Sequence, residues 1–183
     1  MHKQVRKRFP RNRTYAPGVD DQWQADLVDM RQLAKNNRGF QYLLTCIDVF
    51  SKYAWVVPVK EKTSKAMHSA FKALFSAQRR RPRRLQTNKG LEFFNSPVQK
   101  LLRQLHIEHF ASWSDQKAAV VERFNRTLKT RMWRYFSSRN HKNYLPILHQ
   151  LVHAYNNSWH RAIGMTPKEA SRAENSNAVH EKL

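Results

Sequence analysis

The chain has 183 residues, and its 40% hydrophobic and 11% aromatic content is typical of one globular domain with one substantial core rather than of a disordered protein. Lys and Arg number 34 against 13 Asp and Glu, a formal net charge of +21 that favours a polyanionic partner, most often nucleic acid, over an inert basic surface or adsorption to a membrane surface. No apolar run approaches the roughly 18–20 residues that span a bilayer, and the basic start is not followed by the apolar stretch of a secretory signal. Cys46 is the one cysteine of the sequence, which excludes an internal disulfide and a zinc site with two thiolates.

The first 20 residues are rich in basic side chains and show no hydrophobic periodicity. We therefore predict a basic flexible arm over residues 1–20. Its cations could contact phosphates or serve as a nuclear-import signal, and a solvated tail without a function is the alternative. The basic residues of this segment are Lys3, Arg6, Lys7, Arg8, Arg11 and Arg13.

Three β-prone runs follow the arm. Residues 22–30 alternate between apolar and polar side chains, and residues 40–50 are almost continuously apolar, as expected for a buried strand. Residues 53–59 form the third run, and Pro58 places its end at a sheet edge or a bulge. The short connections between these runs predict an antiparallel meander.

The hydrophobic period then changes to that of a helix over residues 63–78, with Thr63 or Ser64 as its cap. The core-facing side chains of this helix are predicted to be Ala66, Ala70, Phe71, Leu74 and Phe75. Later elements are a strand over residues 85–88, a helix over 96–105, a strand over 107–111, helices over 117–137 and 143–158, and a short helix that opens at Thr166.

This order predicts an α/β fold of the ribonuclease H-like class: a five-stranded mixed sheet, made of a three-strand meander followed by alternating helices, and covered by helices. The order alone leaves several α/β topologies open. We assign residues 21–172 to a single core domain and residues 173–183 to a C-terminal tail.

Two carboxylates stand out within these elements. Asp26 lies in the middle of the first strand, where a charge costs free energy unless it is paired or bound to a metal ion; the alternative is that it faces solvent. Glu122 lies near the start of a helix and is followed by Asn125, Arg126 and Lys129 at i+3, i+4 and i+7. This spacing suits a metal ligand whose neighbours hold DNA phosphates, although Glu122 and Arg126 could instead form an ordinary surface ion pair.

Four segments together resemble the catalytic core of retrovirus-like DDE integrases. They are LLTCIDVFSKYAWVVPVK (residues 43–60), LQTNKGLEF (residues 85–93), VVERFNRTLK (residues 120–129) and YNNSWHRAIGMTPKEA (residues 155–170). The match covers residues 21–172 in the order of the family. The motifs are most similar to those of Maverick/Polinton integrases, with gypsy-type retrotransposon integrases next.

The resemblance implies that Asp26 is the first catalytic acid, that Glu122 is the third, and that the second position is occupied by Asn88. In the family these three positions hold two Mg²⁺ or Mn²⁺ ions for DNA end processing and strand transfer. Because the amide of Asn88 is neutral, we expect weakened metal binding and an inactive or impaired enzyme. An engineered and a natural substitution at residue 88 would look the same in the sequence.

The resemblance further implies DNA partners, namely element ends and target DNA held mostly through phosphates, a location in the nucleus, and a homodimer or higher oligomer without a membrane partner. The pairing elements would be residues 63–78 and 143–158, with Ala66, Ala70, His149 and His153 as interface candidates. The candidate DNA-binding residues are Asn125, Arg126, Lys129, Lys89, Lys117, Arg80, Arg81 and Arg83, and Trp113 could stack on a base.

Two other functions remain open. A non-enzymatic DNA-binding or assembly protein derived from an integrase is supported by Asn88 and by the net charge, whereas the intact motifs around Asp26 and Glu122 count against it. A nuclease on the same fold is the second, and the closing segment over residues 155–170 disfavours it.

Overall fold

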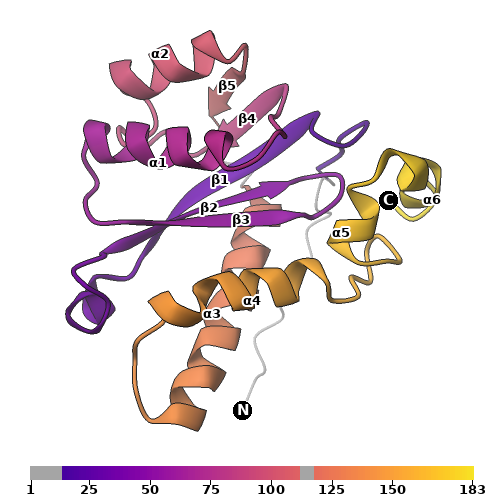
Figure 1. Cartoon of the computed structure of the whole chain (residues 1–183). Helices are drawn as coiled ribbons and strands as arrows, with labels where there is room; N and C mark the ends of the chain where they lie inside the picture. Colours follow the sequence, from indigo (N-terminus) through magenta and orange to yellow (C-terminus); the bar gives the residue numbers. More distant parts are fainter. Residues whose placement is uncertain (1–13, 112–117) are drawn as a thin grey trace, which may run out of the picture.

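A five-stranded mixed sheet forms the centre of the molecule (Figure 1), in a computed structural model that describes residues 14–111 and 118–183. The strands are β1 (Gln22–Asp29), β2 (Tyr42–Asp48), β3 (Ala54–Val59), β4 (Arg84–Thr87) and β5 (Glu108–Ala111). Their order across the sheet is β3-β2-β1-β4-β5. The first three strands pair antiparallel, and β4 and β5 continue the sheet parallel to β1. The predicted meander and mixed sheet are therefore confirmed, and Pro58 lies in the edge strand β3, as expected.

Helices cover both faces of the sheet (Figure 1). α1 (Ser64–Ser76) and α2 (Ser96–Gln104) lie on one face, and α3 (Ala119–Arg139) and α4 (Leu145–Asn156) lie on the other. β1 alternates between the two cores: Trp23 and Ala25 belong to the core under α1 and α2, whereas Val28 and Met30 belong to the core under α3 and α4. The side chains that β1 points toward α3 therefore include Gln24 and Asp26.

Three of the described helices, α1, α2 and α5, begin with a side-chain cap. The Thr63 hydroxyl accepts from the amide of Ala66 at 3.3 Å at the start of α1. Asn95 caps α2, and its Oδ1 accepts from the amide of Val98 at 3.1 Å. The short helix α5 (Pro167–Ala170) opens with a capping box between Thr166 and Glu169.

The structure adds short elements that have too few residues for a readable hydrophobic period. They are the 3₁₀ helices η1 (Arg31–Asn36) and η2 (Ala173–Asn175) and the helix α6 (Ser176–His180). Met67, which the sequence analysis omitted from the core face of α1, is fully buried, whereas Ala66 is only half-buried.

Both ends of the described chain pack on one small cluster. Ala16 and Val179 are 1% and 0% exposed and lie together with Phe50 and Ile163. Packing therefore starts before residue 21, and it includes part of the segment 173–183 that we expected to be a tail. The remaining residues of the predicted arm, 1–13, lie outside the described residues. Among the helices that the structure describes, none is long and apolar enough to cross a membrane.

Candidate functional site

Three buried glutamines form a hydrogen-bonded ladder between β1 and β4. Gln22 and Gln24 each donate from Nε2 to Oε1 of Gln86, at 3.0 and 2.9 Å. Gln24 lies opposite Gln86 in the parallel register of the two strands. Side chains two residues apart on a strand share a face, so Asp26 lies on the same face of β1 as Gln24, which α3 covers. Asn88 comes two residues after Gln86, directly past the end of β4.

The first turn of α3 is held against β1 by Gln24. Its Oε1 accepts from the backbone amides of Val120 and Val121 at 3.0 and 3.1 Å. These amides lack a partner within the helix, and the N-cap residue Ala118 supplies no side-chain hydrogen bond. Gln24 therefore fixes the turn that carries Glu122 beside the strand that carries Asp26. Glu122 is exposed, and within the described residues it forms no ion pair with Arg126. The surface ion pair considered above for these two side chains is therefore absent.

Asp26 is oriented by a buried asparagine of α3. Its Oδ2 accepts from Nδ2 of Asn125 at 2.8 Å, and its Oδ1 accepts from the amide of Leu27 at 2.9 Å. Asn125 is only 8% exposed, and its Oδ1 is buried without a hydrogen-bond partner among the described residues. We expected Asn125 to contact DNA; the structure instead places it against the sheet as a partner of Asp26, because it lies one turn after the buried Val121.

Asn88 follows β4 directly and starts a tight loop. Its Oδ1 accepts from the amide of Gly90 at 2.8 Å, and the Thr87 hydroxyl donates to its backbone oxygen at 2.8 Å. The Glu92 carboxylate folds back over Gly90, where a Cβ would collide with it, and pairs with Lys62 at 3.3 Å. Glu92 is thus held within the loop by its contact with Lys62.

His109 supports this loop from β5, and the sequence analysis did not single it out. Its Nε2 lies 2.9 Å from the Thr87 hydroxyl, its Nδ1 lies 2.6 Å from Nε2 of Gln99, and its ring stacks on Phe94 at 4.2 Å. Burial lowers the pKa of His109 to about 4, so the ring is neutral near pH 7. The feature of the sequence that could have indicated His109 is its position as a polar residue within a short β-prone segment.

The arginine run over residues 79–84 is partly a structural element. Arg80 pairs with Asp20 at 2.7 Å and with the fully buried Asp48 at 3.1 Å, and its guanidinium lies over the rings of Tyr53 and Trp55. Nε and Nη2 of Arg80 thus donate to carboxylates within the fold, and a contact of Arg80 with DNA stays a prediction.

The other candidate DNA contacts differ in availability. Arg83 is exposed but pairs with Asp21 at 2.7 Å. Arg81, Arg126 and Lys129 are exposed, and none of the described acidic side chains forms an ion pair with them. Lys89 is exposed in the loop after Asn88. Two of the candidates, Trp113 and Lys117, lie outside the described residues.

The two helices predicted to pair copies of the chain, α1 and α4, differ in whether their candidate interface side chains are exposed. His149 and His153 are exposed on α4 with ring centroids 6.4 Å apart. No cluster of three metal-ligating His, Cys, Asp or Glu side chains occurs among the described residues. Ala70 is 6% exposed and packs in the core, so its assignment to an interface is wrong, because the apolar face of α1 turns inward.

The comparisons of this chain with known proteins agree on one family. Residues 16–115 match the family described as the integrase core domain, which is more than half of the chain. A transposon-derived protein of Caenorhabditis elegans is 35% identical over 145 residues, which are 79% of this chain and 51% of the relative. The retrovirus-related Pol polyprotein from transposon 412 of Drosophila melanogaster is 30% identical over 108 residues, 58% of this chain and 9% of the polyprotein. The chain thus spans about half of the nematode relative and a small part of the other.

Two solved structures share the fold. The simian T-cell lymphotropic virus intasome in complex with PP2A regulatory subunit B56 gamma superimposes with a TM-score of 0.78 at 20% identity, over 91% of this chain and 59% of that one. The HTLV-2 integrase catalytic core domain in complex with magnesium superimposes with a TM-score of 0.70 at 20% sequence identity, over 85% of this chain and 98% of that one. These likenesses confirm the predicted ribonuclease H-like α/β class.

Proposed function

We propose that this chain, which belongs to the integrase core domain family, is the catalytic core of a DNA-joining enzyme from a transposable element, and that Asn88 impairs its activity. The reaction would be end processing by water and strand transfer by a 3′-hydroxyl, each by in-line attack at phosphorus. The observation that carries the proposal is the arrangement around Gln24, which joins β1, β4 and the first turn of α3. This arrangement supports Asp26, residue 88 and Glu122 as one site.

The donor atoms of this site suit a hard divalent cation. Asp26, Asn88 and Glu122 would contribute oxygen ligands, which Mg²⁺ and Mn²⁺ prefer, and the unpaired Oδ1 of Asn125 adds an oxygen beside Asp26. Two ions in such a site neutralise charge at phosphorus and activate the attacking oxygen. Within the chain, Asn125 would hold the Asp26 carboxylate in place, while the exposed Arg126 and Lys129 would hold DNA phosphates.

The site as it stands should bind metal poorly. Two carboxylates offer two negative charges where two divalent ions need more, and Oδ1 of Asn88 already accepts from Gly90. We therefore expect calorimetric titration with Mn²⁺ to show weak binding at fewer than two sites. Two fully occupied ions about 3.5–4 Å apart in a crystal soaked in Mn²⁺ without DNA would contradict this expectation.

DNA binding should be governed by phosphate contacts, given the net charge of +21. We expect tight binding at low salt that falls steeply with added salt and depends little on sequence. Each of Arg81→Gln, Arg126→Gln and Lys129→Gln should reduce the slope of log K against log salt by about 0.9 where the side chain touches a phosphate. Arg103→Gln, on α2 across the sheet from α3, is the control and should leave the slope unchanged. A flat salt dependence of the parent chain would refute phosphate-dominated binding.

We further propose that the core forms a homodimer or higher oligomer through α1 and α4. The HTLV-2 core domain has been solved in dimeric and trimeric forms, and His149 and His153 leave an exposed face on α4. A double change to Glu at these two positions should weaken self-association in sedimentation equilibrium. Sedimentation of the parent chain as a monomer at high concentration would refute the dimer.

The type of element is proposed from the four motifs, which favour a Maverick/Polinton element over a gypsy-type retrotransposon, and a DNA substrate favours action in the nucleus. The second candidate function is a DNA-binding or assembly protein derived from an integrase. It is favoured by Asn88, whose neutral side chain caps its own loop, and by the nematode relative, which is named as transposon-derived. Restoring an acid at residue 88 separates the two candidates.

A further inference from the structure

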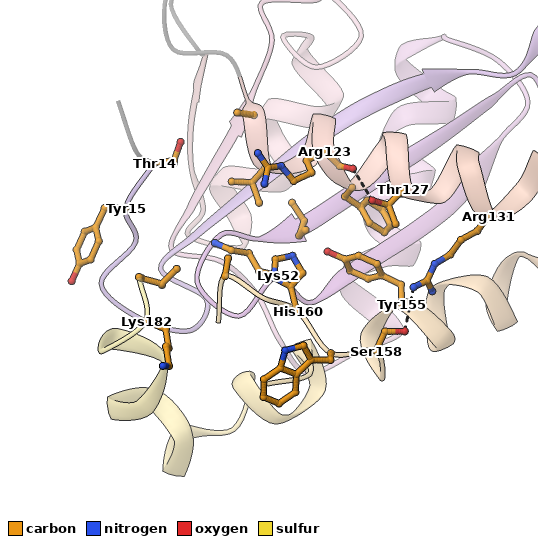
Figure 2. A pocket seen from close by; sticks show the side chains of 17 residues that line it. Thr14, Tyr15, Lys52, Arg123, Thr127, Arg131, Tyr155, Ser158, His160 and Lys182 are labelled. Atoms are coloured by element: carbon orange, nitrogen blue, oxygen red, sulfur yellow. Dashed lines mark hydrogen bonds between the residues drawn. The ribbon is translucent and has the colours of Figure 1, made fainter. Parts of the chain in front are cut away.

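A cavity of about 700 Å³ lies between α3 and the segment that follows α4 (Figure 2). Arg123, Thr127 and Arg131 line it from α3, spaced by four residues along one face. Glu122 precedes Arg123 by one residue, which is about 100° around the helix. The cavity therefore does not share the face of α3 that carries Glu122.

A lysine ammonium is buried at the inner wall of this cavity. Lys52 is 8% exposed and follows the turn after β2. Its Nζ donates to the backbone oxygen of Val49, which satisfies one of its three donors. Burial lowers the pKa of Lys52 to about 8, so the group is still mostly protonated near pH 7. A buried cation is stabilised by an anion in contact with it, and the cavity gives an anion access to Lys52.

A histidine beside Lys52 leaves a buried nitrogen without a partner. His160 comes from the segment after α4, and its Nδ1 is buried and unpaired among the described residues. Burial, followed by the charges of Lys52 and Arg123, lowers the pKa of His160, and a weaker contact of the ring with its own backbone opposes that shift. The neutral ring can carry its proton on Nδ1 and donate it to an oxygen acceptor. An unpaired buried polar atom is costly, and an acceptor in the cavity would remove that cost.

Among the described residues, the charged side chains that line the cavity are all basic, while the negative charge of Asp48 near Lys52 acts to raise the pKa of that lysine. The last residue, Leu183, also lines the cavity. Lys52, Arg123, Arg131 and Lys182 line it, and no Asp or Glu does. Arg131 is partly engaged, since it donates to the Ser158 hydroxyl at 3.2 Å and lies over the ring of Tyr155. Arg123 is exposed and forms no ion pair with a described acidic side chain, so its guanidinium can form charge-assisted hydrogen bonds to a ligand.

We propose that this cavity is a phosphate-binding site in which Lys52, Arg123 and His160 hold the phosphate oxygens. Two cations and one neutral donor match the charge and the several acceptor oxygens of a phosphate group. The phosphate could belong to a DNA backbone or to a free phosphorylated molecule. The inference goes beyond the proposed DNA joining and does not depend on it, because it requires neither metal nor catalysis.

The test follows the imidazole of His160 by two-dimensional long-range ¹H–¹⁵N NMR, with the signal assigned by comparison with His160→Gln. Titration of the full chain with inorganic pyrophosphate should shift the His160 nitrogen signals saturably. Arg123→Gln should weaken the affinity about tenfold, the value of one charge-assisted hydrogen bond. Lys52→Met should weaken it at least as much, and its thermal unfolding is measured in parallel. Arg103→Gln on α2 is the matched control for loss of one positive charge and should change the affinity less than twofold.

A second titration with a short DNA duplex distinguishes the sources. If the duplex displaces pyrophosphate and itself shifts His160, the site takes DNA phosphates; if pyrophosphate alone shifts it, the site takes a free phosphorylated molecule. Either result supports the phosphate site. The proposal is overturned if neither ligand shifts His160, or if Arg123→Gln and Arg103→Gln weaken pyrophosphate binding equally, since that would indicate a general charge effect. Because Arg123 is exposed, its variant keeps the test valid even if Lys52→Met does not fold.

Discussion

Asn88→Asp is expected to give a chain that binds two divalent ions and catalyses disintegration of a branched DNA substrate, whereas the parent chain shows little or no activity. The added carboxylate keeps one oxygen for the amide of Gly90, as Asn88 does now at 2.8 Å, and offers the other to metal beside Asp26. A ligand lost from a two-metal site removes charge stabilisation that develops in the transition state. A loss of about 4 kcal/mol corresponds to roughly a thousandfold in rate, so the gain in rate should be of this size or larger.

The matched controls separate the assignments within the site. Glu122→Gln in the Asn88→Asp background should remove one of the two metal sites and abolish disintegration, while Glu92→Gln, in the loop and paired with Lys62, should retain most of the activity. If the Asn88→Asp chain folds, binds DNA and two ions, and remains inert, the DNA-binding or assembly function is favoured. If it fails to bind a second ion, the assignment of residue 88 to the site is wrong.

Asn125 illustrates which parts of the site the sequence could predict. The helix and its start were readable from periodicity, and the motif placed Glu122 beside a row of polar residues. Asn125 was grouped with that row, but it is buried and donates to Asp26, 99 residues earlier in the chain. Local spacing assigns a residue to a helix face only to within about one position, because a residue advances about 100° around the helix. A residue at the border of two faces therefore needs the packed structure.

The glutamine ladder was missed for a related reason. Gln22, Gln24 and Gln86 looked like ordinary polar positions of strands, and nothing local indicates that two strands more than 60 residues apart would join them. A run of amide side chains at every second position of otherwise buried strands is the signal that could have been used. Buried amides need partners, and here the partners are one another and the amides of the first turn of α3.

Arg80→Met is expected to destabilise the fold by roughly 3 kcal/mol at pH 7, the scale for breaking a buried ion pair by removing one partner. Asp48 is fully buried and would lose its 3.1 Å contact with Arg80. Burial already raises the pKa of Asp48, while the hydrogen bond from the Ser51 side chain and, after it, the charge of Arg80 oppose that rise. Without Arg80 the folded-state pKa rises further above its unfolded value, so the ionised carboxylate destabilises the variant at neutral pH. The deficit relative to the parent should shrink as the pH falls through the pKa of Asp48 in the folded variant, because the carboxyl then becomes neutral.

Urea unfolding of parent and variant at pH 7 and at a mildly acidic pH measures that deficit directly. Arg81→Met is the matched control, since Arg81 is exposed and pairs with no described acidic side chain; it should leave the unfolding free energy within about 0.5 kcal/mol. Adding Asp48→Asn to Arg80→Met should recover part of the loss at pH 7, because the buried charge is gone while Asn can still accept from the amide of Ser51. DNA binding should show the opposite ranking of the two variants. Arg81→Met should lower the salt dependence of DNA binding, whereas Arg80→Met, measured under conditions in which it is folded, should leave that salt dependence unchanged. Equal destabilisation by Arg80→Met and Arg81→Met, or a deficit that grows as the pH falls, would show that the Arg80–Asp48 pair does not have the structural role assigned to it.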